Sequence, residues 1–355
     1  MPETIRSIAQ THAVRVESRA IIVAAGAFVV SGLVGLLVMH GTFLPMWKEW
    51  SVGLLAIIVG SVVGAIAYAL SARDSRRRAR ESGALTRSLP RFIWDTTALT
   101  FTHVAILAML GLVLFSTLQT AFTGLEVDTL TGTMMVALSG AASAYFLSLS
   151  AATTTANKMS TLLSIFLTSG VLLSMTTTTD PHWWQANFSI LGTTRDFSAI
   201  TFNLTLIITG ATITILADYV TRDLADWMKD QVGRATPHIR VLKWALVSIG
   251  VLLACVGLVP VNRALLVHNT VATGMVVIFV ALMIALKLLL PGYPQTFFAL
   301  GYAFLGCIGV AAFLFFPIGY YNLTAFELIA SALIFSWLVI FVRNTAAVTG
   351  AAGSR

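Results

Sequence analysis

The chain has 355 residues, of which 57% are hydrophobic and only 10% are charged, and its mean hydropathy is +0.87. This composition excludes a water-soluble fold. The formal net charge of +7 would suit a nucleic-acid partner, but the basic residues gather in a few segments between apolar runs. That placement is typical of membrane proteins, so we predict no nucleic-acid partner.

Long apolar runs recur along the chain, and each is long enough to cross roughly 30 Å of hydrocarbon as a helix. Backbone groups in lipid must be hydrogen-bonded within the protein, and the runs lack the alternation of barrel strands. We therefore predict an all-α integral membrane protein with about ten transmembrane helices. The spans lie near residues 20–40, 52–72, 93–116, 131–151, 159–178, 198–218, 241–261, 269–290, 296–317 and 325–343.

Lysine and arginine set the predicted orientation. With the N-terminus cytoplasmic, 19 of the 22 basic residues fall inside, and only Lys48, Arg195 and Arg263 fall outside. This bias supports an even number of spans and places both termini in the cytoplasm, in a multi-pass protein of the plasma membrane. No small-residue cleavage site follows the first span, so we expect that span to be retained.

The spans suggest two membrane regions with short tails. We predict a cytoplasmic N-terminal segment 1–19, a four-helix region 20–151, a six-helix domain 159–343 and a cytoplasmic tail 344–355.

Two cytoplasmic connections have distinct patterns. The loop 73–91 contains seven arginines, which fix topology and touch anionic headgroups. A docking site for a protein or nucleotide is less favoured, because no glycine-rich phosphate loop accompanies them. The segment 218–240 has apolar residues at helical spacing, which predicts an amphipathic helix that continues the sixth span and lies at the interface.

Small and hydroxyl residues predict where helices touch. Gly60 with Gly64, and Gly140 with Ala144, have the four-residue spacing of close helix contacts. Hydroxyl stripes mark the fifth and sixth spans: Ser160, Ser164 and Thr168, then Thr201, Thr205, Thr209 and Thr212. Such hydroxyls most often bond the carbonyl four residues earlier in their own helix, or bond a neighbouring helix. A polar conduit is the alternative, in which Thr205 and Thr209 would be candidate residues.

Charge inside the spans is scarce, which argues against a proton pump. Asp95 follows Arg91 at a spacing suited to an ion pair, and only His103 is a titratable group near a span centre. One histidine can relay a proton, but more often it is neutral and hydrogen-bonded to a hydroxyl or a carbonyl.

Sequence motifs for chemistry are missing. His40, His182 and His268 fall on the predicted outer side, in different connections and without metal-ligand spacing. Cys255 and Cys307 lie inside spans and form no metal set. No hydrolase, metalloprotease or nucleotide motif is present. We therefore assign no catalytic residue, metal or cofactor, and the sequence leans against an enzyme.

The predicted outer loop 179–197 is dense in polar and aromatic residues. Trp183 and Trp184 suit the headgroup level, and we predict a charge pair between Arg195 and Asp196 just outside the sixth span. Asn203 lies one turn into the sixth span, where an amide without a partner is costly, so it should bond the loop or another helix. The loop should fold back over the helices as a cap, a lid or a headgroup site. The candidate binding residues are His182, Trp183, Trp184, Ser189, Arg195, Asp196 and Asn203.

The run FSILG at 188–192, followed by SAITFNLTLIITG at 198–210, resembles the signature of a bacterial multi-pass family of unknown function. That family is grouped with the Frag/DRAM/Sfk superfamily, and the resemblance covers about residues 159–343. It implies a six-helix domain in a bacterial inner membrane and a link to membrane-lipid organisation or lipid-anchor remodelling. It supplies no catalytic residues and says nothing of the first four spans.

Three classes of function follow. We favour a membrane protein that recognises envelope lipids or glycolipids, or assists their handling, through the outer loop. Its partners would be membrane lipids and other membrane or envelope proteins. A transporter or permease subunit is the alternative, supported by ten spans and the hydroxyl stripes. An intramembrane lipid-modifying enzyme is a further alternative, which lacks a recognisable nucleophile and base.

Overall fold

The computed structural model describes residues 3–83, 88–153, 155–232 and 237–352, which fold into two compact units, 1–154 and 155–355. In these described ranges, 10 helices are long and apolar enough to cross a membrane. The chain is therefore an all-α, multi-pass membrane protein. Helix follows from composition here, because only internally hydrogen-bonded segments are stable in hydrocarbon.

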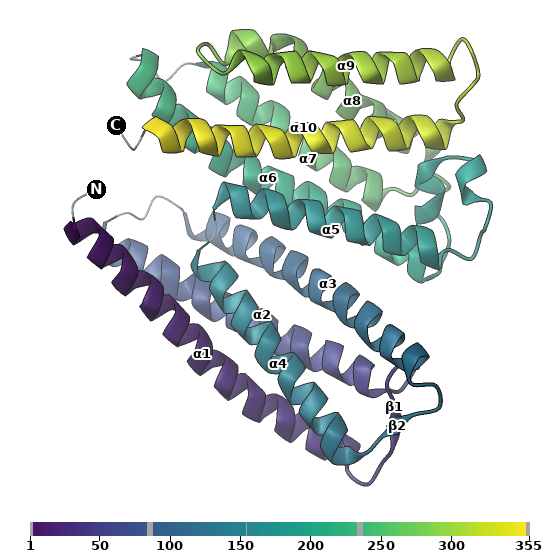
Figure 1. The fold of residues 1–355 in the computed structure, drawn as a ribbon. Helices are drawn as coiled ribbons and strands as arrows, with labels where there is room; N and C mark the ends of the chain where they lie inside the picture. The colour runs from purple at the N-terminus through teal and green to yellow at the C-terminus, as the bar shows by residue number, and fades with distance from the viewer. Residues whose placement is uncertain (1–2, 84–87, 154, 233–236, 353–355) are drawn as a thin grey trace. The chain divides into compact units, whose positions relative to one another are not determined.

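Unit 1 is a four-helix region. Its helices are α1 (Glu3–Met39), α2 (Val52–Glu81), α3 (Leu89–Ala121) and α4 (Thr129–Ala152). Helix α4 packs along both α1 and α2, and α3 packs against α2 (Figure 1). The short strands β1 (Leu44–Pro45) and β2 (Glu126–Val127) pair antiparallel and join two of the connections.

The glycine contacts predicted for unit 1 are confirmed. A Cβ at Gly60 of α2 would lie 2.9 Å from the Ser143 Oγ atom of α4. A Cβ at Gly140 of α4 would lie 2.0 Å from the Ser31 Oγ atom of α1. Small residues on both faces of α4 therefore let three helix backbones approach closely.

The arginine-rich segment 73–91 is not all loop. Helix α2 continues to Glu81, and α3 begins at Leu89; residues 84–87 lie outside the described ranges. Arginine favours helix, and the pair Arg77–Glu81, 2.8 Å apart at i,i+4 spacing, adds to that preference. The arginines therefore lie largely on a helical extension.

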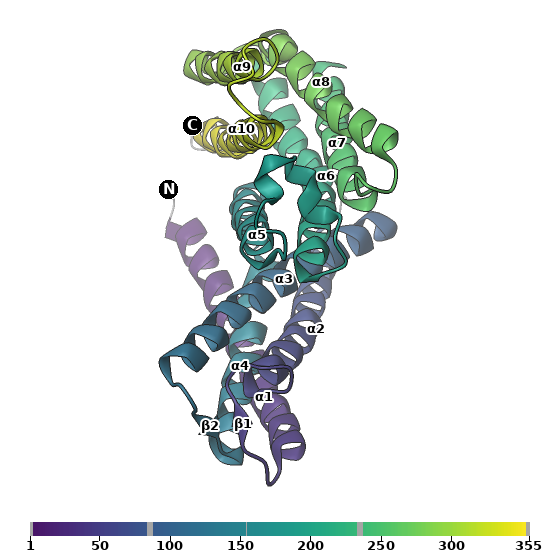
Figure 2. The ribbon, with the colours of Figure 1, turned by 90° about the vertical axis from the view of Figure 1, so that its right-hand side faces the viewer.

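Unit 2 is a six-helix region with an irregular connection between its first two helices. Its helices are α5 (Ala156–Thr177), α6 (Phe197–Val232), α7 (Pro237–Leu258), α8 (Leu265–Leu289), α9 (Gln295–Phe315) and α10 (Leu323–Ala352). Two 3₁₀ turns, η1 (Trp183–Gln185) and η2 (Phe188–Gly192), lie between α5 and α6. Helix α6 packs along α5, α7 and α10, while α8 packs against α7 and α9 (Figures 1 and 2).

Helices α6 and α7 cross at a pair of glycines. A Cβ at Gly210 would lie 2.3 Å from the Gly250 carbonyl oxygen, and a Cβ at Gly250 would lie 2.6 Å from the Gly210 carbonyl oxygen. No side chain fits at either position without moving backbone. The glycines therefore set how closely the two central helices of unit 2 pack.

The segment 218–232 continues α6, as its pattern predicts, but its apolar face is covered by protein. Leu224 and Met228 are buried, and the Trp227 ring lies 6.2 Å from the Tyr293 ring between α8 and α9. Asp218 is also buried and accepts from Lys243 of α7 at 2.6 Å. The segment therefore belongs to the core of unit 2, because its apolar stripe faces the neighbouring helices.

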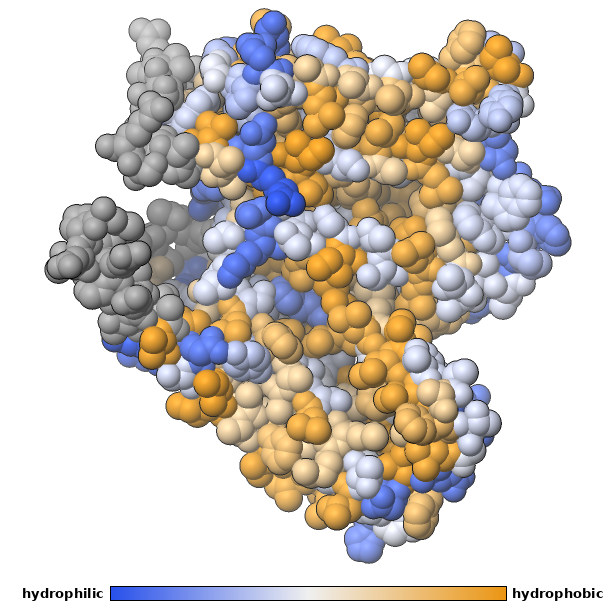
Figure 3. Space-filling view, in the orientation of Figure 1, coloured by the Kyte–Doolittle hydropathy of each residue, from blue (hydrophilic) through white to orange (hydrophobic). Residues whose placement is uncertain are grey.

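The helix flanks of unit 2 carry large apolar side chains on the outside, such as Leu288 at 77% and Val310 at 59% exposure. Apolar residues cover much of the flanks in Figure 3. A soluble protein rarely exposes such a continuous apolar surface, and a membrane protein places it against lipid.

Candidate functional site

Three connections meet at one end of unit 2, which we call the loop end: residues 178–196, 259–264 and 316–322. The Asn262 side chain donates to the Thr193 carbonyl oxygen at 3.1 Å. The Asn322 side chain donates to the Trp184 carbonyl oxygen at 2.8 Å. The segment 178–196 is thus fastened to both other connections and packs over the helix ends.

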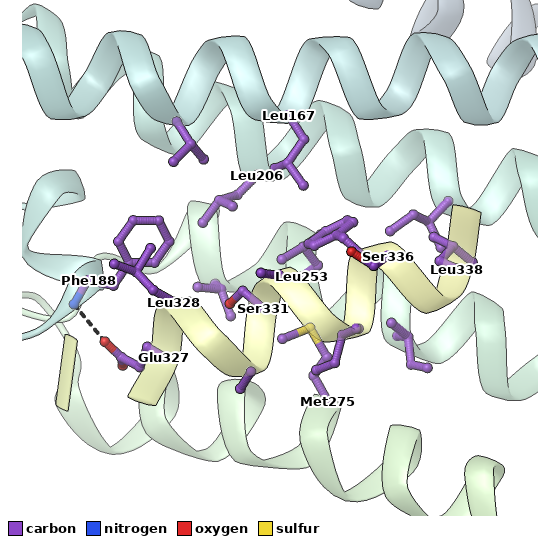
Figure 4. A pocket seen from close by; sticks show the side chains of 18 of the residues that line it. Leu167, Phe188, Leu206, Leu253, Met275, Glu327, Leu328, Ser331, Ser336 and Leu338 are labelled. Atoms are coloured by element: carbon purple, nitrogen blue, oxygen red, sulfur yellow. Dashed lines mark hydrogen bonds between the residues drawn. The ribbon is translucent and has the colours of Figure 1, made fainter. Parts of the chain in front are cut away.

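Phe188 anchors this segment to the helices. Its ring is buried, 5.1 Å from the Phe202 ring of α6 and 6.4 Å from the Trp183 ring. Its backbone N–H donates to the Glu327 carboxylate of α10 at 2.6 Å (Figure 4). This hydrogen bond holds η2 against the start of α10.

Beneath η2 lies a cavity of about 740 Å³, the large cavity, between α5, α6, α7, α8 and α10. Figure 4 shows leucines from α5, α6 and α7 and Met275 of α8 around the α10 side chains. Along α10 the lining runs from Phe326 to Ile340, a rise of about 21 Å at 1.5 Å per residue. The cavity is therefore long as well as wide.

The lining is overwhelmingly apolar. Its few hydroxyl and carboxyl side chains are Ser164, Thr168, Ser189, Glu327, Ser331 and Ser336. Glu327 and Ser189 lie at the loop end, where η2 closes over the helices. A ligand that fits has a long apolar part and a polar group at that end. The run of the cavity along α10, about 21 Å, is longer than one leaflet, which is about half of the 30 Å hydrocarbon core. The cavity volume is that of a ligand site.

A second hollow of about 580 Å³, the small cavity, is lined by Gly192 at the end of η2 and by the residues that follow it. Arg195 and Arg263 line it with the side chains of Asn203 and Asn262. Asn203 donates to the Gly192 carbonyl oxygen at 2.9 Å, which confirms that this amide bonds the loop. Two guanidinium groups in one hollow favour an anionic group, because arginine matches phosphate and carboxylate geometry.

The structure divides the seven candidate loop residues among different roles. Ser189 lines the large cavity, and Arg195 and Asn203 line the small one. Trp183 packs near Phe188, while the Trp184 side chain is 50% exposed. His182 is exposed, and its backbone N–H donates to the Asp180 carboxylate at 2.8 Å. The seven residues therefore do not form one pocket.

Asp196 is the N-terminal cap of α6. Its carboxylate accepts from the Ala199 backbone N–H at 3.0 Å and from the Thr194 and Thr179 hydroxyls at 2.6 and 2.9 Å. Burial acts to raise the pKa of Asp196, but these hydrogen bonds together outweigh it and lower the pKa below its usual value. Among the described residues Asp196 forms no ion pair with Arg195, so the predicted charge pair is replaced by capping.

Ser189 and His268 form a hydrogen-bonded pair that sequence reasoning missed. His268 lies in the first turn of α8 and is only 3% exposed. Its Nε2 atom lies 3.0 Å from the Ser189 Oγ atom, and its Nδ1 atom lies 2.6 Å from the Val259 carbonyl oxygen. The two side chains are 79 residues apart in sequence, so no local spacing could have revealed them.

Two of the three candidate polar residues inside spans, His103 and Thr205, have hydrogen-bond partners. His103 Nδ1 lies 2.7 Å from the Leu99 carbonyl oxygen, and its Nε2 lies 2.6 Å from the Ser150 Oγ atom. Thr205 donates to the Thr201 carbonyl oxygen at 2.7 Å. The Thr209 hydroxyl is buried without a hydrogen-bond partner in the described part of the chain.

Most hydroxyls of the two stripes with a hydrogen bond given by the structure bond carbonyl oxygens of their own helix. Ser164, Thr201 and Thr212 each donate to the carbonyl four residues earlier in the same helix. Their hydroxyl hydrogens are thus used within the helix, as expected for structural hydroxyls. The predicted ion pair between Arg91 and Asp95 is confirmed at 3.1 Å. The hydroxyl hydrogen bonds within each helix weigh against a continuous polar conduit through the two stripes.

Metal binding finds no support in the geometry. Over the described residues, no group of three or more His, Cys, Asp or Glu side chains is placed to hold a metal ion.

No family model matches the chain, and neither a curated protein nor a solved structure matches it. The resemblance of residues 159–343 to the bacterial membrane family stays a prediction.

Proposed function

We propose that unit 2 binds a membrane lipid or glycolipid, with an acyl chain in the large cavity and the polar part at the loop end. The single observation that carries this proposal is the cavity itself, about 740 Å³ of apolar space that runs about 21 Å along α10. A small polar solute would bury its hydrogen-bonding groups against leucine and phenylalanine, at a cost of several kcal/mol. An acyl chain carries no such cost.

The loop end supplies contacts for a headgroup. Ser189 and Glu327 border the large cavity, while Arg195 and Arg263 border the small cavity beside it. The η2 turn lines both cavities, with Phe188 and Ser189 facing one and Gly192 facing the other. We infer that the arginines favour an anionic headgroup, and that envelope lipids of this kind are the partners.

The proposal also includes the orientation in the membrane. The excess of arginine and lysine in the segments opposite the loop end supports cytoplasmic termini and a loop end on the outer side of a plasma membrane. In a Cys255→Ser, Cys307→Ser background, Trp183→Cys should react with an impermeant thiol reagent in intact cells. Reaction only after permeabilisation would place residue 183 in the cytoplasm and would contradict the proposed orientation.

The experiment blocks the cavity. Ser331 lies in the middle of the α10 lining (Figure 4), and Ser331→Trp fills space that an acyl chain would need. Val310→Trp, on the exposed flank of α9, adds the same indole outside the cavity. We expect native mass spectrometry to detect bound lipid on the wild type and Val310→Trp, with at least tenfold lower occupancy on Ser331→Trp.

Equal occupancy in all three proteins would show that the lipid binds elsewhere and would remove the proposal. Thermal unfolding of both tryptophan variants distinguishes a blocked cavity from a chain that fails to fold.

A further inference from the structure

Ser189, at the loop end of the large cavity, has the partners of an activated nucleophile. A carbonyl oxygen only accepts hydrogen bonds, so the contact with Val259 assigns the ring hydrogen of His268 to Nδ1. In the neutral ring Nε2 is then an acceptor, and the Ser189 hydroxyl donates to it at 3.0 Å. This is the order of groups that activates a serine: nucleophile, base, and a third group that orients the base.

The surroundings place the serine between the base and the cavity. His268 is buried behind it and does not line the large cavity, whereas Ser189 does. The Val259 carbonyl follows the end of α7, nine residues before His268, so two helix ends fix the imidazole. A ligand carbonyl at the loop end would meet the hydroxyl oxygen first.

Unit 1 also contains a serine–histidine contact, but it does not border either cavity described above. His103 contacts Leu99 and Ser150 at 2.7 and 2.6 Å, and neither His103 nor Ser150 lines either cavity described above. There the Ser150 hydrogen bond joins α3 to α4, and the Leu99 contact lies within α3. A serine–histidine contact is thus not sufficient by itself. The access of Ser189 to an apolar cavity is what distinguishes the pair in unit 2.

We propose that Ser189 and His268 catalyse acyl transfer from an ester lipid bound in the large cavity, an inference that rests on the proposed lipid-binding function. Ser189 Oγ forms a bond to the ester carbonyl carbon while its proton passes to His268 Nε2. The bond from that carbon to the alcohol oxygen then breaks, and the alcohol leaves with the proton from Nε2. The products are an acyl-serine and a lyso-lipid.

A hydroxyl group completes the cycle by the same proton path. Water, or the hydroxyl of a second lipid, attacks the acyl-serine while His268 takes its proton. The bond between the acyl carbon and Ser189 Oγ breaks, and the proton returns to Ser189. Hydrolysis releases a fatty acid; transfer to the second lipid releases an acylated product. No oxidant or reductant is needed.

The test uses an alkyl fluorophosphonate, which phosphonylates activated serines and releases fluoride. The purified full chain is treated with a long-chain and a short-chain probe, and the modified residues are mapped by mass spectrometry. We expect an adduct on Ser189, formed faster with the long chain. Ser331 and Ser336, which line the same cavity without a histidine contact given by the structure, serve as internal controls and should stay unmodified.

Two variants test whether the rate of Ser189 labelling depends on His268. His268→Gln should slow labelling of Ser189 by about 100-fold, the lower range of general-base effects, while Ser150→Ala should leave the rate unchanged. If His268→Gln fails to fold, the labelling rates of Ser189, Ser331 and Ser336 in the wild type still test whether Ser189 is activated. Labelling of all three at equal rates, or none at Ser189, would overturn the catalytic proposal.

Lipid occupancy of the same wild-type preparation separates the two claims. Bound lipid without a Ser189 adduct would leave lipid binding intact and remove catalysis. A His268-dependent adduct on a protein without bound lipid would support activation of Ser189 by His268. It would contradict the proposed lipid binding.

Discussion

At the scale of single residues, hydrogen-bond partners decide what each polar side chain does. Asp196 and Ser189 are seven residues apart, and both are polar residues of one segment. Asp196 accepts from the Ala199 N–H and two hydroxyls, which fixes the start of α6. Ser189 donates to a buried imidazole at the edge of a cavity. One residue therefore belongs to the scaffold, and the other to the candidate chemistry.

The cap on α6 has a defined pH dependence. The hydrogen bonds lower the pKa of Asp196 in the folded chain relative to the unfolded chain. Its contribution to stability is therefore complete above the ordinary aspartate pKa of about 3.9 and is lost as pH falls through the folded pKa. Asp196→Ala should cost about 1 kcal/mol at pH 7, the usual value for loss of a helix cap.

Thermal unfolding in detergent at pH 7, 5 and 3.5 checks this. The wild type should unfold at a higher temperature than Asp196→Ala at pH 7 and 5, and the gap should narrow at 3.5. Asp226→Ala removes an exposed aspartate of the same helix and serves as the control. A wild type no more stable than Asp196→Ala at pH 7 would mean that the cap is unimportant.

At the scale of elements, close backbone contact between α6 and α7 supports one wall of the large cavity. Gly250→Ala would place a Cβ 2.6 Å from the Gly210 carbonyl oxygen, so the helices must separate. Overpacking of this kind costs about 1–3 kcal/mol. Gly309→Ala adds the same methyl group on α9, where no heavy atom lies within 4 Å. It should be neutral or slightly stabilising.

The free energy of unfolding of both alanine variants, measured by denaturant titration in the same detergent, distinguishes the two positions. Loss of stability in Gly250→Ala alone agrees with the crossing described above. Equal losses in both variants would indicate that helical glycine matters for a reason other than this contact.

The helices themselves were predictable because hydrophobic length is a local property. All ten spans occur in the described chain near the predicted positions, and the predicted glycines of α2 and α4 lie against other helices. Helix ends were less predictable. Residues 73–81 extend α2 where a loop was expected, because charged residues that end a hydrophobic run do not end a helix, whereas the extension of α6 through residues 218–232 was predicted from its pattern.

The candidate site was predictable only in part, since it depends on contacts between distant segments. The segment 179–197 stood out by its polar and aromatic content, and the Asn203 bond followed from the cost of a buried amide. Neither the large cavity nor the Ser189–His268 pair has a local signature. Both arise where five helices and η2 meet.

At the scale of the whole molecule, lipid binding requires that unit 2 hold an acyl chain inside its helices and not merely against its apolar flanks. Both surfaces are apolar: Leu206 and Leu328 line the cavity, while Val310 and Leu288 face outward. Composition does not separate the two modes, because every multi-pass protein contacts lipid on its flanks. Location of the bound chain separates them.

Photo-crosslinking with a phospholipid that carries a diazirine near the end of one acyl chain measures that location directly. The full chain is reconstituted with this lipid, illuminated, and the modified residues are mapped by mass spectrometry. We predict adducts on cavity residues of α5, α6 and α10, such as Leu167, Leu206 and Leu338, and their loss in Ser331→Trp. Adducts confined to outward residues such as Leu288 and Val310 would contradict a lipid-filled cavity.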